Sequence, residues 1–292
     1  MSKVIGIDLG TTFSAIASLD DLGNPEVLAS IEDNRKITAS AVYLKDNEVI
    51  VGDKALNYLK DQSNNVILQT KREMENDVVY STDEGKWVTD KDLVDAYTPA
   101  QVSSLILKKL KEYTSDVKKV VITVPAMFAE KARQATLDAA KIADLEVIEL
   151  INEPTAAVLH YASLPGVEVG GRVMIFDLGG GTFDVTFAEV KNKKVDVMTS
   201  RGDKYLGGRD FDKEITKLMK KKYFDVHNVE IDIENNKEYI HKAEEVKKIL
   251  SVKDKANIEI TGPKGPQKIE ITQEEFEESI QTYIEKIKML IE

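Results

Sequence analysis

The stretch IGIDLGTTFS at residues 5–14 is repeated, in altered form, as IFDLGGGTFDV at residues 175–185. In both, a short apolar run ends in Asp-Leu-Gly, and a threonine and a phenylalanine follow. After the first turn, apolar residues recur at every second position from Phe13 to Leu19, which predicts a returning strand instead of a helix. The same strand–turn–strand unit therefore occurs twice, with Asp8 and Asp177 separated by 169 residues.

This internal repeat predicts two lobes of common origin, because a repeat that spans half a chain is not a solenoid. We expect lobe I at residues 1–168 and lobe II at residues 169–292. The finer division that we expect is a lobe I core at 1–35 and 96–168 with an inserted subdomain at 36–95, and a lobe II core at 169–206 followed by a subdomain at 207–292.

The rest of the chain mixes strands and helices. Proline is favoured in the first turn of a helix, so Thr98-Pro99 predicts a helix that runs to about Tyr113. The other predicted elements are strands at Val27–Ile31, Ala41–Leu44, Lys119–Val124 and Glu146–Leu150, a helix from about Ala129 to Ala143, and a helix that begins near Asn152-Glu153-Pro154.

Residues 272–292 predict one helix that reaches the last residue. Thr272 and Glu275 have the spacing of a capping box, and apolar residues then recur at helical spacing as far as Ile291. No glycine or proline ends this helix, and the second lobe would be the shorter one. We therefore expect a C-terminally truncated chain, with a natural terminal helix as the alternative.

Composition excludes several classes of protein. The 292 residues suffice for two domains, and 51 acidic against 40 basic residues give a net charge of −11, which argues against nucleic-acid or anionic-membrane partners. Without cysteine there is no disulfide and no thiolate zinc site. No signal segment is visible and no apolar run approaches the ~20 residues of a membrane span. We expect a cytoplasmic protein.

The paired glycine-rich turns predict a phosphate site. Backbone N–H groups in such turns can converge on an anion. The aspartate before each turn would repel a phosphate, so a cation must lie between them, and hydrated Mg²⁺ fits. Neither a Walker loop nor a dinucleotide fingerprint matches, because no helix follows the glycines. Either turn alone would be a structural hairpin; the pair favours the phosphate site.

Five stretches together resemble the ATPase domain of the DnaK-type seventy-kilodalton heat-shock chaperones. They are IGIDLGTTFS (5–14), VITVPAMFAEKARQAT (121–136), INEPTAA (151–157), IFDLGGGTFDV (175–185) and GDKYLGGRDFD (202–212), and the likeness covers essentially the whole chain. It implies an α/β, actin-like and hexokinase-like bilobal ATPase fold with duplicated mixed-sheet cores and an incomplete second lobe. It also implies a stress-response chaperone in which ATP hydrolysis by the full-length protein drives a peptide-binding clamp that is absent here.

The resemblance assigns roles around the phosphates. The first turn (Gly10, Thr11 and Thr12) and the second (Gly179, Gly180, Gly181 and Thr182) would hold the β- and γ-phosphates of ATP or ADP. Asp8, Glu153 and Asp177 would hold hydrated Mg²⁺, with K⁺ as a second candidate cation, and Asp177 would also orient or deprotonate the attacking water. Lys71 matches the catalytic lysine, although alone it would be interpreted as a solvated surface charge. The implied catalytic set is Lys71, Asp177, Glu153, Thr182 and Asp8.

The resemblance also implies a nucleoside site and protein partners. Gly207 and Gly208 would approach the ribose and phosphates, and the adenine-side helix would carry Glu244, Lys247, Lys248 and Ser251; the alternative for that helix is an ordinary charged face. In the full-length protein the partners would be unfolded polypeptide clients, a J-domain cochaperone and a nucleotide exchange factor.

The sequence departs from the family in three places. Lys248 stands where many members have an arginine, and a lysine lacks the planar guanidinium that an arginine can stack on adenine. Glu149 stands where an arginine usually meets the J-domain cochaperone, so the reversed charge argues against ordinary pairing. The late Gly-Gly-Ser-Thr-Arg-Ile-Pro segment, which completes the adenosine pocket, does not occur.

Three alternatives remain at this point. The same fold could belong to an actin-like filament subunit that uses nucleotide to control polymerisation, or to a sugar kinase, although no sugar-binding signature is visible. A truncated, non-catalytic chaperone fragment is the third.

Overall fold

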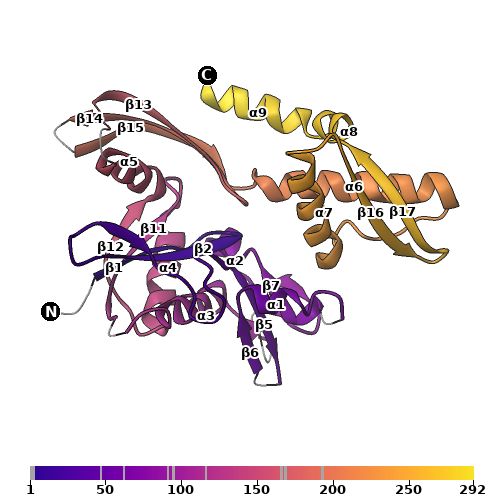
Figure 1. Cartoon of the computed structure of the whole chain (residues 1–292). Helices are drawn as coiled ribbons and strands as arrows, with labels where there is room; N and C mark the ends of the chain where they lie inside the picture. Colours follow the sequence, from indigo (N-terminus) through magenta and orange to yellow (C-terminus); the bar gives the residue numbers. More distant parts are fainter. Residues whose placement is uncertain are drawn as a thin grey trace. The chain divides into compact units, whose positions relative to one another are not determined.

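A computed structural model describes residues 4–46, 48–61, 63–90, 92–93, 96–115, 117–164, 167, 170–191 and 194–292. The chain divides into two compact units, Met1–Lys204 and Tyr205–Glu292 (Figure 1). The predicted lobe boundary at residues 168 and 169 lies outside the described residues.

A mixed sheet forms the centre of the first unit. Its strand order is β12-β11-β1-β2-β3, and β4 also pairs with β2. In β1, Ile5 and Ile7 are buried while Val4, Gly6 and Asp8 are exposed, so the period of two places Asp8 on the open face. The strands are β1 (Val4–Asp8), β2 (Phe13–Leu19), β3 (Pro25–Val27), β4 (Thr38–Ala39), β11 (Lys119–Val124) and β12 (Glu146–Asn152).

Two helices pack on this sheet's buried side. The helices are α3 (Pro99–Lys111) and α4 (Glu130–Ile142), and they share a core with Ile5, Ile7 and Ile122. The predicted start of α3 is confirmed: Thr98 and Gln101 form a capping box, and Pro99 is the first helical residue. This packing fixes β1, and hence the turn that follows Asp8, against a rigid layer.

One predicted strand is wrong in its extent. Residues Val27–Ile31 were expected to be extended, whereas β3 ends at Val27. The chain turns instead at Ser30, whose N–H donates to the Arg35 carbonyl and whose carbonyl accepts from the Asn34 N–H. The apolar residues Leu28 and Ile31 are thus outside the strand, and Ile31 is exposed.

Short elements make up residues 41–97. Two small sheets have the strand orders β6-β5-β7 and β10-β8-β9. The elements are β5 (Ala41–Lys45), β6 (Glu48–Val51), α1 (Asp53–Leu56), a 3₁₀ turn (Ser63–Asn65), β7 (Val66–Leu68), α2 (Thr70–Glu73), β8 (Val79–Ser81), β9 (Lys86–Val88) and β10 (Ala96–Tyr97).

The second copy of the repeated hairpin lies in a three-stranded antiparallel sheet. Its strands are β13 (Gly171–Leu178), β14 (Phe183–Lys191) and β15 (Lys194–Asp203). Asp177 pairs with Asp184 across β13 and β14, much as Asp8 pairs with Ala15 across β1 and β2. Helix α5 (Glu153–Ser163) contacts β12 of one sheet and β13 and β15 of the other, so it connects the two sheets that carry the hairpins within one unit.

The second unit consists of two helices, a hairpin and a helical C-terminus. Its elements are α6 (Gly208–His227), α7 (Lys237–Leu250), β16 (Lys255–Gly262), β17 (Gly265–Thr272), α8 (Gln273–Ser279) and α9 (Gln281–Ile291). The capping box of Thr272 and Glu275 is confirmed, but the single helix predicted after it is wrong. Ile280 leaves helical geometry at φ −99° and ψ 4°, so the helix breaks into α8 and α9.

None of the helices in the described part of the chain has the length and apolar character needed to cross a membrane.

Candidate functional site

Both glycine-rich turns line one cavity of about 730 Å³ in the first unit. The β1–β2 turn contributes Asp8 and residues 10–12, and the β13–β14 turn contributes Asp177, Gly179, Gly180 and Thr182. Lys71 from α2 and Glu153 from the first turn of α5 also line the cavity, and together with Asp8 and Asp177 they form its charged end. The polar residues predicted around the phosphates thus lie together.

The glycines allow these two turns to approach closely. A Cβ on Gly180 would lie 2.0 Å from Thr12 Oγ1, and one on Gly181 would lie 2.6 Å from Thr11 Cγ2. Both distances are far below van der Waals contact, so a side chain at either glycine would force the threonine side chains of the first turn to move. The repeat of glycines after Asp177 therefore has a packing reason, and none of these three glycines has a positive φ.

Several backbone N–H groups of the turns are available to a ligand. The N–H of Gly10 donates to Ser14 Oγ at 3.1 Å, and that of Gly179 donates to the Thr182 carbonyl at 2.9 Å. Within the residues that the structure describes, no acceptor is recorded for the amides of Thr11, Thr12, Gly180, Gly181 and Thr182. Unpaired N–H groups that line a cavity suit anionic oxygen atoms.

Lys71 is buried, with 9% of its surface exposed, and its Nζ donates to Glu153 Oε1 at 2.5 Å. Burial opposes the charge on Lys71, but the carboxylates of Glu153, Asp8 and Asp177 outweigh burial and raise the pKa of the ammonium. Lys71 is therefore cationic at neutral pH. The alternative of a solvated surface lysine does not describe this position.

The site contains more acidic groups than basic ones. Burial raises the pKa of Glu153 despite its contact with Lys71. Burial also raises the pKa of Asp177, and the nearby charge of Asp8 adds to the effect. One lysine cannot neutralise these carboxylates, so a cation added to this end of the cavity would relieve their repulsion.

Asp184 is a further acid close to Glu153 and Asp177 that sequence reasoning missed. It is 3% exposed, and its Oδ1 accepts no hydrogen bond from the described residues. Burial, together with the charges of Glu153 and Asp177, raises its pKa to about 7. The available signal was the acid that directly follows Thr182-Phe183, where the first copy of the repeat has Ser14 after Thr12-Phe13.

The donor set fits hydrated Mg²⁺. Among the described residues, no three acidic or histidine side chains lie close enough together to ligate a metal directly. Asp8, Glu153 and Asp177 nevertheless line one cavity with oxygen donors only, and Mg²⁺ commonly keeps its water ligands and uses few carboxylates. Asp8 Oδ1 is already held by the Thr123 hydroxyl at 3.0 Å, which orients this carboxylate.

The model of the Hsp70 protein family matches residues 4–292. The chain belongs to the Hsp70 family. It is 35% identical over 320 residues to a protein named chaperone protein dnaK from Trieres chinensis, an alignment that covers all of this chain and 52% of the relative. It is 42% identical over 243 residues to the chaperone protein DnaK of Mycoplasmopsis agalactiae, an alignment that covers 80% of this chain and 37% of the relative.

This family membership confirms the resemblance and the α/β, actin-like fold class that it implied. Membership of this family does not favour the alternative of an actin-like filament subunit. The chain spans about half the length of the first of these relatives and less of the second.

The second unit of this Hsp70 chain groups the residues predicted for the nucleoside. Lys247 Nζ lies 2.6 Å from Asp212 Oδ1 and donates to the Gly208 carbonyl at 2.7 Å. It therefore ties α7 to the start of α6, where the Gly207 N–H donates to Asp210 Oδ2. Along α7, Lys248 pairs with Glu244 at 2.8 Å, and the exposed Ser251 donates to the Lys247 carbonyl.

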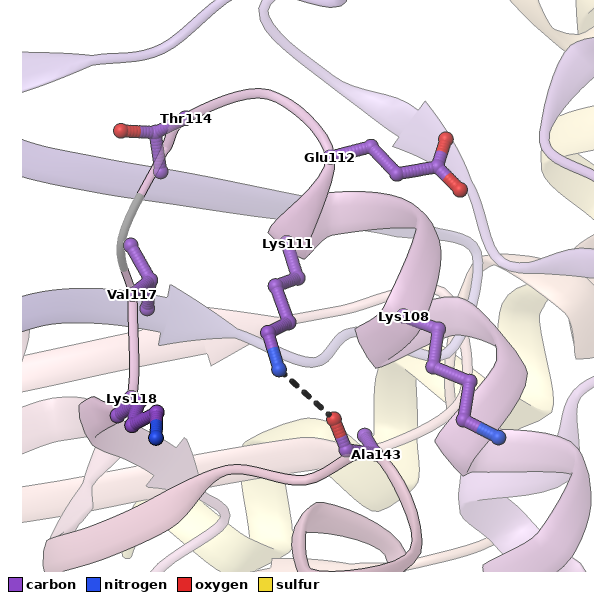
Figure 2. Close-up of a pocket in the computed structure, with 7 residues that line it drawn as sticks. All are labelled: Lys108, Lys111, Glu112, Thr114, Val117, Lys118 and Ala143. Atoms are coloured by element: carbon purple, nitrogen blue, oxygen red, sulfur yellow. Dashed lines mark hydrogen bonds between the residues drawn. The ribbon is translucent and has the colours of Figure 1, made fainter.

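A second cavity of this Hsp70 chain, of about 610 Å³, has a structural explanation. It lies where α3 and α4 end, and Figure 2 shows Lys111 between Lys108 and Lys118 with its Nζ directed at the Ala143 carbonyl. Lys111 also donates to the Asp144 carbonyl at 2.8 Å. A lysine that binds the last carbonyls of a helix compensates their missing partners and the negative end of the helix dipole.

Proposed function

We propose that this chain is the nucleotide-binding domain of an ATP-dependent chaperone that binds ATP or ADP with Mg²⁺ and, in the full-length protein, hydrolyses ATP. The observation that carries this proposal is the single cavity lined by Asp8, Glu153, Asp177 and Lys71 beside two glycine-rich turns. Family membership supports the same function.

In this proposal the backbone amides of the two turns bind phosphate oxygens. The hydroxyls of Thr11, Thr12 and Thr182 add donors. Asp8, Glu153 and Asp177 hold hydrated Mg²⁺, which would neutralise charge on the β- and γ-phosphates, and K⁺ is a second candidate cation. Lys71 places a buried positive charge beside the transferred phosphoryl group, and Asp177 orients or deprotonates the attacking water.

We propose that Glu244, Lys247, Lys248 and Ser251, with Gly207 and Gly208, contact the adenosine. The mutual contacts of Lys247, Gly208 and Asp212 support an ordered group there. We keep the lobes at residues 1–168 and 169–292, with the finer division given above, as part of the proposal. The proposal also includes three kinds of partner for the full-length protein: unfolded polypeptide clients, a nucleotide exchange factor, and a J-domain cochaperone whose pairing is altered at Glu149. It further includes a cytoplasmic location.

Calorimetric titration of this chain with ADP and Mg²⁺ tests nucleotide binding. Micromolar affinity that depends on Mg²⁺ and is lost in Asp8→Asn is the expected result, because that carboxylate is needed to hold the cation. Absence of binding in the unaltered chain would instead favour the non-catalytic fragment.

Lys71→Ala tests the chemistry. Single-turnover ATP hydrolysis in the full-length protein should fall by about 10²-fold or more, since a buried charge beside the phosphoryl group is removed. Lys60→Ala, at an exposed lysine on the surface of the same unit, is the matched control and should keep the original rate. Rates of Lys71→Ala and the unaltered protein that agree within about twofold would refute the assigned role.

A further inference from the structure

Arg72 makes a contact that the catalytic assignments above leave unexplained. Its Nε donates to the Gly181 carbonyl at 2.8 Å, across 109 positions of sequence. Arg72 follows Lys71 in α2, and Gly181 lies in the β13–β14 turn. The bond therefore links the short helix that carries the buried lysine to the second glycine-rich turn.

Gly181 is enclosed on both sides at this contact. A Cβ on Gly181 would lie 2.6 Å from Thr11 Cγ2 and 2.9 Å from Arg72 Nε. The glycine is buried between the first turn and α2, so its peptide unit has little freedom to rotate. Arg72 itself is not among the residues that line the cavity and acts on it through the backbone.

The direction of one peptide bond follows from this contact. No cis peptide bond is present in the described residues, and in a planar trans peptide the C=O and N–H point in opposite directions. Because the Gly181 carbonyl faces Arg72, the N–H of Thr182 faces away from it. Thr182 lines the cavity, and no acceptor for its N–H is recorded among the described residues.

We infer that Arg72 is a positioning residue that holds the Gly181–Thr182 peptide so that the Thr182 N–H donates to a phosphate oxygen of the ligand. This inference rests on the proposed nucleotide function. The ligand class is a nucleoside di- or triphosphate, and the part recognised is its polyphosphate. A directional N–H···O=C bond is required, so positive charge alone at position 72 is not sufficient.

Two variants of Arg72 separate the effect of its directional hydrogen bond to Gly181 from the effect of its positive charge. Arg72→Lys keeps the positive charge but lacks the planar Nε–H, and Arg72→Gln removes the charge as well. The probes are Mg²⁺–ADP and Mg²⁺–tripolyphosphate, titrated calorimetrically into the full chain. Both variants should bind each probe about tenfold more weakly or worse, the range for a lost hydrogen bond to a charged group. The matched control is Arg35→Lys, whose exposed side chain pairs with Asp53, and it should bind as the unaltered chain does.

An amide-resolved readout tests the mechanism directly. In ¹H–¹⁵N spectra the Thr182 amide should shift strongly on addition of Mg²⁺–tripolyphosphate, and this shift should be lost in Arg72→Lys while the Thr12 amide still responds. Thermal unfolding of each variant establishes that it is folded. If Arg72→Lys binds like the unaltered chain, or the Thr182 amide still shifts in it, the positioning role is refuted while the proposed function stands. If the unaltered chain binds neither probe, the proposed function fails and this inference fails with it.

Discussion

Asp184 does not line the cavity, but it is buried near the acids Glu153 and Asp177, and its Oδ1 accepts no hydrogen bond from any described residue. Its burial, with Glu153 and Asp177 nearby, raises its pKa to about 7. An acid with a raised pKa in the folded state favours folding while it is protonated, and this contribution is lost as the pH rises from its ordinary value of 3.8 through about 7. Asp184 therefore costs stability at neutral and higher pH when no cation is bound.

Replacing Asp184 by Asn should remove this cost. Without added Mg²⁺, Asp184→Asn should raise the free energy of unfolding at about pH 8 by on the order of 2 kcal/mol and change it little at about pH 4, because only the charged form is penalised. Urea unfolding at both pH values measures the effect. Asp196→Asn, at an exposed residue of β15, is the control. An equal effect of Asp184→Asn at both pH values would contradict the assignment.

At the scale of the element, α4 ends in an ordered cap. Asp144 has a left-handed φ of 55°, and the Leu145 N–H donates to the Ala140 carbonyl at 3.0 Å, which is a Schellman arrangement. Lys111 of α3 then binds the remaining carbonyls of Ala143 and Asp144. The C-terminus of one helix is thus stabilised by a side chain from its neighbour.

Lys111→Met should destabilise the first unit by about 1 kcal/mol, since it removes a cation from the end of a helix and leaves carbonyls without a donor. Lys108→Met is the matched control: Lys108 lines the same cavity, and among the described residues it has no ion pair or hydrogen bond. Urea unfolding monitored by far-ultraviolet circular dichroism measures both variants. Equal losses in the two would show that the capping contact contributes nothing specific.

At the scale of the whole molecule, each unit has its own core. The second unit buries Ile215, Met219, Tyr223 and Ile260 in one cluster, to which α6, α7 and the β16–β17 hairpin all contribute. All polar residues of the phosphate site belong to the first unit. A unit with a contiguous apolar core can fold without its neighbour.

Residues 205–292 expressed alone should therefore fold. A cooperative urea transition and dispersed amide signals are expected, because the buried cluster lies wholly within this segment. Ile260→Asn, which places a polar group in the cluster, should abolish the transition. A gradual, non-cooperative loss of signal in the unaltered segment would contradict the division into units.

Local sequence was sufficient for the elements near the site. The short apolar run at residues 4–7 predicted β1, and Thr98-Pro99 predicted the start of α3, because apolar runs and helix caps depend only on neighbours in the chain. The break at Ile280 was not predictable in this way. Its apolar side chain fits the helical period, yet the backbone there leaves helical geometry.

The repeated Asp-Leu-Gly turns were enough to predict two matching hairpins and a phosphate site, since glycine-rich turns and strand periods are properties of short segments. Tertiary structure alone buried Lys71 against Glu153, added Asp184 to the acids and joined Arg72 to Gly181. The Lys71 and Arg72 contacts connect residues 82 and 109 positions apart, and the surroundings of Asp184 include Lys71 and Glu153 from distant parts of the chain. Packing of separate elements creates such contacts and sets their burial and charge environment, so no local pattern carries them.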